Sequence, residues 1–137
     1  MPVFMDVKEF PVPEHQADAV LNQANPISGT KYTVLPTTKN VRIITIATKV
    51  TWTVQPSPLE LHIIIDGVNI PISQIDPVSD TWYNAELVDS WTPSAGFSTA
   101  HHPHRSFLLE GRSVKVEVEI TGGTVSNLNS IVKYAKW

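Results

Sequence analysis

Three histidines stand within four residues of the sequence, at His101, His102 and His104, in a chain that has five histidines. Residues two apart on a β-strand point to the same side, so the imidazoles of His102 and His104 could bind one metal ion. Pro103 between them disfavours a regular strand. Further ligands would have to come from His101, from Glu110, or from His62 together with Glu60. The interpretation that we favour is a solvated loop that is rich in histidine.

The same segment partly resembles the first metal-binding motif of cupins, a family of metal-binding β-barrels. That motif has a glycine, five residues, His-x-His, three or four residues, a glutamate and later another glycine. Gly96 precedes His102 at the matching spacing, but Glu110 follows after too long a gap and the last glycine is missing. No later histidine completes the second cupin motif. A cupin-like metal-dependent enzyme is therefore our third hypothesis, and we expect no catalytic residues, no metal and no cofactor.

Exposed aromatic rings would point to a different function, because sugars stack on tryptophan and tyrosine side chains. Trp82 and Tyr83 are adjacent, so on a strand they face opposite ways and one of them could be exposed. Trp91 could join either of them to bind a glycan. The alternative is packing in the core or in an interface, and for Trp52 we expect the core. A carbohydrate-recognition module is our second hypothesis.

The composition places these residues in one globular domain. The chain has 137 residues, of which 42% are hydrophobic and 17% are charged. A net charge of -3 without basic clusters gives no reason to expect a nucleic acid or a membrane as partner. The absence of cysteine excludes disulfides and thiolate metal sites. Because the N-terminal residues lack the pattern of a signal peptide, we expect the protein to fold in the cytoplasm.

Residues 1–29 differ from the rest, with four prolines and no alternation of apolar residues. We interpret them as an N-terminal arm or tail, with at most one short helix between Gln16 and Gln23. Phe4 and Phe10 make this segment more apolar than disordered tails usually are. The arm could therefore lie on a neighbouring subunit.

Residues 30–137 are predicted to form a single antiparallel β-sandwich, either Ig-like or a jelly-roll. The segment 59–72 predicts a hairpin that turns at Asp66–Gly67 and pairs Ile65 with Val68. Pro71 places the second strand of this hairpin at an edge or a bulge. Further strands are expected at 42–54, where the first residues are apolar on both faces, and at 81–88, 107–109, 113–121 and 131–137. The segment 89–105 lacks periodicity and is expected to be a long loop.

Four segments carry a family resemblance: NPISGTKYTVLPTTKNVRIITIA (25–47), VTWTVQP (50–56), IDG (65–67) and FLLEGRSVKVEVEI (107–120). They resemble small β-sandwich structural proteins of tailed bacteriophages. The resemblance, which covers residues 25–137, implies a non-enzymatic virion protein that is made in the host cytoplasm. It would act as a homo-oligomer, expected to be a trimer, bound to a major capsid or tail protein. Residues 1–29 and 89–105 would make the contacts, with these interface or ligand candidates: Phe4, Phe10, Trp91, Phe97, His102 and His104.

Overall fold

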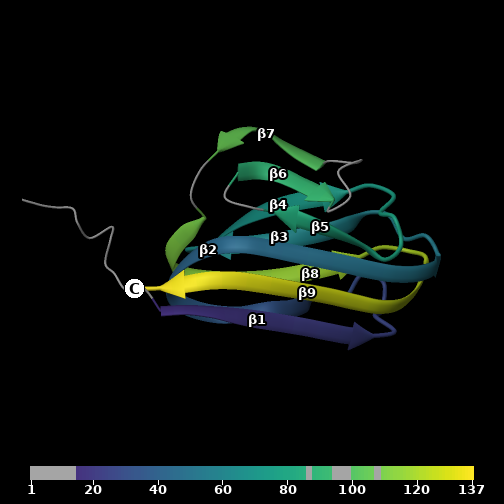
Figure 1. Cartoon of the computed structure of the whole chain (residues 1–137), viewed down its shortest axis with the longest axis horizontal. Coiled ribbons are helices and arrows are strands. Elements are labelled where there is room, and N and C mark those ends of the chain that lie inside the picture. The colour runs from purple at the N-terminus through teal and green to yellow at the C-terminus, as the bar shows by residue number, and fades with distance from the viewer. Residues whose placement is uncertain (1–14, 86–87, 94–99, 107–108) are drawn as a thin grey trace, which may run out of the picture.

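The computed structural model describes residues 15–85, 88–93, 100–106 and 109–137, which form an all-β protein (Figure 1). Within these residues the strands are all paired antiparallel. In chain order they are β1 (His15–Ala24), β2 (Tyr32–Val54), β3 (Leu59–Ile65), β4 (Val68–Gln74), β5 (Thr81–Ala85), β6 (Val88–Pro93), β7 (Ala100–Ser106), β8 (Glu110–Ile120) and β9 (Thr124–Lys136). Among the described residues, none forms a helix long and apolar enough to cross a membrane.

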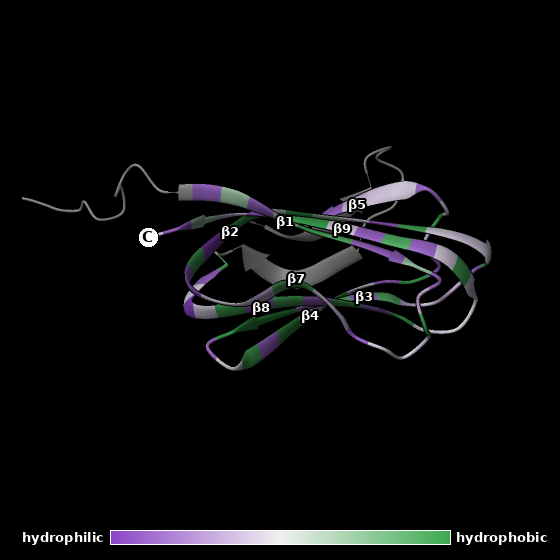
Figure 2. Ribbon diagram, turned by 90° about the horizontal axis from the view of Figure 1, so that it is seen from below, coloured by the Kyte–Doolittle hydropathy of each residue, from purple (hydrophilic) through white to green (hydrophobic). Residues whose placement is uncertain are grey.

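The strands form a β-sandwich, as predicted, whose two layers share the long strand β2 (Figure 2). In the first layer, β4, β3 and β8 lie beside residues 32–42 of β2. In the second layer, β1 and β9 lie on one side of residues 41–54 of β2, and β5, β6 and β7 follow on the other side. Strand β2 therefore passes from one layer to the other, and the core lies between the layers.

A bulge in β2 allows this passage. The register with β9 shifts between Ile43 and Thr45, and a bulge of this kind bends a strand and increases its twist. Before the bulge Val41 and Ile43 are buried, whereas after it the buried positions are Ile46, Thr48 and Val50. Because the bulge shifts which face of the strand points to the core, apolar residues occur on both faces at the start of residues 42–54. An apolar start on both faces predicts a central strand or one covered by another chain, and β2 is central, with neighbours on both sides.

The predicted hairpin is confirmed in position and register. Ile65 pairs with Val68, and Asp66 and Gly67 have φ angles of 50° and 83°, as a turn with positive φ at both positions requires. Pro71 lies in β4, which ends the strand order, so the predicted edge position is also confirmed. The turn is fastened to β8, because the Asp66 amide donates to the Ser113 carbonyl and the Ser113 amide donates to Asp66 Oδ1.

The helix predicted between Gln16 and Gln23 is wrong. This segment is strand β1, which pairs with β9 along its whole length. Ala19 and Leu21 point to the core and Val20 points outward; the small alanines hide this alternation in the sequence. The sandwich therefore begins before residue 30, and the part of the expected arm from His15 to Ala24 belongs to it.

The long loop predicted at 89–105 is also wrong for its described residues, because Val88–Pro93 and Ala100–Ser106 are strands β6 and β7. Strand β7 is the last strand of the second layer and β6 lies beside it, and strands near a sheet edge often lack a regular apolar alternation. An edge strand also tolerates Pro103, which cannot donate a ladder hydrogen bond.

The other predicted strands differ mainly in length. Strand β8 is confirmed, with the expected inward residues buried at Val114, Val116, Val118 and Ile120. The last strand begins earlier than expected, at Thr124, and the strand expected at 81–88 is described as β5 up to Ala85. Of the segment 107–109 only Leu109 is described, and it is buried outside any strand.

Candidate functional site

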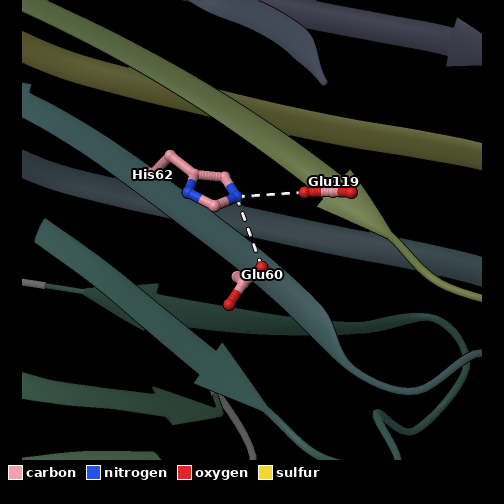
Figure 3. Close-up of side chains that lie close together, drawn as sticks. All are labelled: Glu60, His62 and Glu119. Carbon is pink, nitrogen blue, oxygen red and sulfur yellow. Dashed lines mark hydrogen bonds and ion pairs between the residues drawn. The ribbon is translucent and has the colours of Figure 1, made fainter. Parts of the chain in front are cut away.

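Three ionisable side chains meet on the outer face of the first layer (Figure 3). Strand β3 supplies Glu60 and His62, and strand β8 supplies Glu119. Strand alternation explains the position of the first two. Leu61 between them is fully buried in the core, so Glu60 and His62 point away from it. Glu119 reaches them because it lies directly opposite Glu60 in the antiparallel register.

Both carboxylates approach the same imidazole nitrogen. Nε2 of His62 lies 3.1 Å from Oε1 of Glu119 and 3.3 Å from Oε1 of Glu60. The amide Nδ2 of Asn69 lies 3.2 Å from Nδ1 of His62, and the Ser73 hydroxyl donates to Oε2 of Glu60 at 3.1 Å. With the Asn69 amide donating to Nδ1, Nε2 carries the proton and donates it to Oε1 of Glu119, while Glu60 lies at ion-pair distance. Residues of β4 thus orient both β3 side chains of the cluster.

His62 is buried, although its place beside Glu60 on the polar face of a strand predicts an exposed residue. Only 8% of its side chain is exposed, against 31% for Glu60 and 18% for Glu119. Neighbours on both flanking strands cover the ring, which the alternation within one strand cannot reveal. The expectation that His62 is exposed is therefore wrong.

The charges of this cluster do not balance. Two carboxylates face one imidazole, which carries at most a single positive charge. The nearby Glu117 is compensated separately, since its carboxylate lies 3.0 Å from the Lys115 ammonium. The cluster therefore keeps excess negative charge in a partly buried place, where screening by solvent is weaker than at an open surface.

Most of the site residues predicted from the sequence fall outside the described part of the chain. Phe4, Phe10 and Phe97 are among the residues not described. Trp91 lies in β6, and His101, His102 and His104 lie in β7, but their side chains are also outside the described residues. Among the predicted metal ligands, the structure brings Glu60 and His62 together. Glu119 was missed, and Glu110 instead forms an ion pair with Arg42 at 3.3 Å.

The two aromatic residues proposed to bind sugar beside Trp91 are both engaged. Tyr83 is fully buried, and its hydroxyl accepts a hydrogen bond from the Val78 amide. The half-buried ring of Trp82 lies 5.2 Å from the Lys49 ammonium, a cation–π distance. Tyr83 is therefore excluded as a sugar-stacking platform. Trp52 is half-buried against the core, in partial agreement with its predicted core position.

Loops gather at the end of the sandwich opposite the Asp66–Gly67 turn. The β1–β2 loop is joined to the β8–β9 turn where the Gly122 amide donates to the Ser28 hydroxyl. The Ser57 amide, in the β2–β3 loop, donates to the carbonyl of Thr121, and the Ser57 hydroxyl accepts from Asp76 in the β4–β5 loop. We call this region the loop end. Its exposed large apolar side chains are Ile27, Val54, Ile75 and Val78.

No protein-family model matches the chain, and no curated protein matches its sequence.

Proposed function

We propose that this protein is a non-enzymatic structural protein of a tailed-bacteriophage particle. It associates with copies of itself, as a trimer, and binds a capsid or tail surface through the loop end. The observation that carries the proposal is the concentration of exposed apolar side chains at the loop end. The phage setting, and with it the virion location, comes from the resemblance of residues 25–137 to phage β-sandwich proteins.

Exposed apolar side chains are unevenly distributed over the molecule. Of the seven large apolar side chains exposed among the described residues, four belong to the loop end. Scattered apolar residues on a surface have no special meaning, but apolar residues that gather in one region mark interaction sites. This distribution favours a protein partner with an apolar surface.

The loop that carries Ile75 and Val78 is held in place by hydrogen bonds from Trp52 of β2. Nε1 of Trp52 donates to the Pro77 carbonyl at 2.9 Å, and the Trp52 amide donates to the Ser79 hydroxyl at 3.0 Å. The apolar side chains are thus presented on a fixed backbone, so that little conformational entropy is lost when a partner binds.

We assign self-association to strand β1 at the edge of the second layer. This strand belongs to the expected N-terminal arm. Among the described residues, β9 is the only strand that pairs with β1, so the other edge of β1 offers backbone donors and acceptors. Such an edge pairs readily with a strand of another chain. The N-terminal residues and the β6–β7 region remain our proposal for the remaining subunit contacts.

The proposal is tested by comparing Ile75→Asp with Val68→Asp. These side chains are 67% and 64% exposed, but Val68 lies at the hairpin turn, at the opposite end of the sandwich. We expect Ile75→Asp to reduce binding to co-expressed capsid or tail proteins encoded beside it at least tenfold, because a carboxylate would lose its hydration in an apolar interface. Val68→Asp should bind like the wild type.

Sedimentation of the assemblies measures this binding, and light scattering after size exclusion measures the oligomeric state. We expect a trimer for the wild type and for both variants. A wild-type monomer at all concentrations would contradict the proposed self-association, and equal binding by the two variants would contradict the role of the loop end.

A further inference from the structure

We infer that Glu60, His62 and Glu119 form a binding site for a divalent transition-metal ion, with Zn²⁺ as the best match. The donor set is one imidazole nitrogen and two carboxylate oxygens, and both are ligand types that Zn²⁺ takes in proteins. The set is distinct from the histidine-rich strand β7, and the inference is independent of the proposed particle-binding role.

The two nitrogen–oxygen distances of the cluster fit an ion of this size. With ligand bonds of about 2.1 Å, two ligands of one zinc ion lie about 3.0 Å apart at a right angle and about 3.4 Å apart at the tetrahedral angle. The distances from His62 Nε2 to the two carboxylate oxygens, 3.1 Å and 3.3 Å, fall in this interval. The three donor atoms all lie within 4.8 Å of one another. An ion could therefore be bound with small rotations of the side chains.

The charge of the cluster independently favours a cation. Without an ion, two carboxylates share a single imidazole, and Lys115 is already engaged by Glu117. A divalent ion bound to a neutral imidazole and two carboxylates gives a net charge of zero. It would thus remove repulsion between carboxylates that are partly withdrawn from solvent.

The residues around the cluster can support the ligands in the metal-bound form. When Nε2 binds the ion, the imidazole proton is carried by Nδ1, and a half-turn of the Asn69 amide presents its oxygen to accept that proton. Ser73 already donates to the outer oxygen of Glu60, which leaves the inner oxygen for the ion. Ligands oriented by such outer partners are typical of metal sites.

The two glutamates leave the outer side of the cluster open to solvent, since Glu60 is 31% exposed. Water would complete the coordination there. This arrangement, with a buried nitrogen ligand below and an open position above, resembles zinc sites that exchange their outer ligand rather than sites closed by four protein ligands.

The test is zinc binding by the full chain without a histidine tag, measured by calorimetry and by metal analysis after dialysis. Glu119→Gln removes a ligand and keeps the size of the side chain, whereas Glu117→Gln removes the same charge from the residue opposite His62 on the same strand, which is not one of the three donors. We expect the wild type and Glu117→Gln to bind one equivalent. Glu119→Gln should bind at least about 100-fold more weakly, since loss of a supporting residue alone costs 10- to 100-fold.

A variant with His101→Ala, His102→Ala and His104→Ala separates this site from the histidine-rich strand. It should retain one equivalent of zinc with wild-type affinity, and Co²⁺ bound to it should show the visible absorption of a low-coordinate site. Circular dichroism checks that each variant is folded. The inference is overturned if the folded wild type shows no saturable binding, if Glu119→Gln binds as well as Glu117→Gln, or if the triple variant loses the ion.

Discussion

Two consecutive glycines in the β8–β9 turn differ in what surrounds them. Gly122 and Gly123 both have positive φ angles, 71° and 73°. A β-carbon on Gly122 would meet no atom within 4 Å, whereas one on Gly123 would lie 2.5 Å from the carbonyl oxygen of Val54 and 2.6 Å from the nitrogen of Pro56. At Gly123 the obstacle is backbone, which cannot rotate away as a side chain can.

We predict that Gly123→Ala lowers the free energy of unfolding much more than Gly122→Ala does. The alanine at Gly122 should cost about 1 kcal/mol, because only the left-handed backbone conformation is penalised. The alanine at Gly123 should cost about 3 kcal/mol or more, because steric overlap with the β2–β3 connection is added to that penalty. Urea denaturation of both variants gives the two values, and equal losses would show that the connection yields without cost.

At the residue scale, two of the three residues of the candidate metal site could be found from the sequence. Period-two alternation puts Glu60 and His62 on one face of β3, and it puts Glu119 on the outward face of β8. What alternation cannot supply is the register between these two strands, which places Glu119 opposite Glu60 and within reach of His62. The burial of His62 depends on the same information, because its cover comes from neighbouring strands.

At the scale of elements, strand β1 is joined to the sandwich through one face. Leu21 packs against the core, and its neighbour Val20 is 65% exposed. We predict that Leu21→Ala lowers the free energy of unfolding by about 1–2 kcal/mol, less than at a fully buried position. Val20→Ala should change it by less than about 0.5 kcal/mol.

Thermal and urea denaturation of these two variants measure the difference. If both substitutions were equally harmless, β1 would be attached too loosely to count as a strand of the sandwich. If both were equally costly, its outer face would be covered as well, which would favour a subunit contact there.

Elements with strong local signals were predicted well, and those defined by long-range packing were not. The hairpin of β3 and β4 was found because its turn residues and its apolar pattern agree on one register. Strands β1, β6 and β7 were missed because each lies toward an edge of the second layer, where alternation is weak. The bulge in β2 was visible only as apolar residues on both faces, of which Ile44 is half-buried in the structure.

At the scale of the whole molecule, the shared strand makes the two layers one unit. Strand β2 pairs with β8 in the first layer and with β9 in the second, so unfolding of β2 would disrupt both layers. We predict that the sandwich unfolds in a single transition. Hydrogen exchange should then give the same free energy of opening, within about 1 kcal/mol, for the amides of Val116 in β8 and Val132 in β9. A clearly lower value for one of them would mean that its layer opens independently.

The pairing of β1 with β9 has a consequence for how the chain is made. His15 pairs with Lys136, so the partner of β1 leaves the ribosome only after nearly all other strands have appeared. At usual rates of translation this takes roughly ten seconds. During that time β1 and the adjoining edge of β2 have no β9 to pair with. The sandwich therefore cannot close before β9 has been made, and nascent chains on one messenger can exchange β1 strands before each of them meets its own β9.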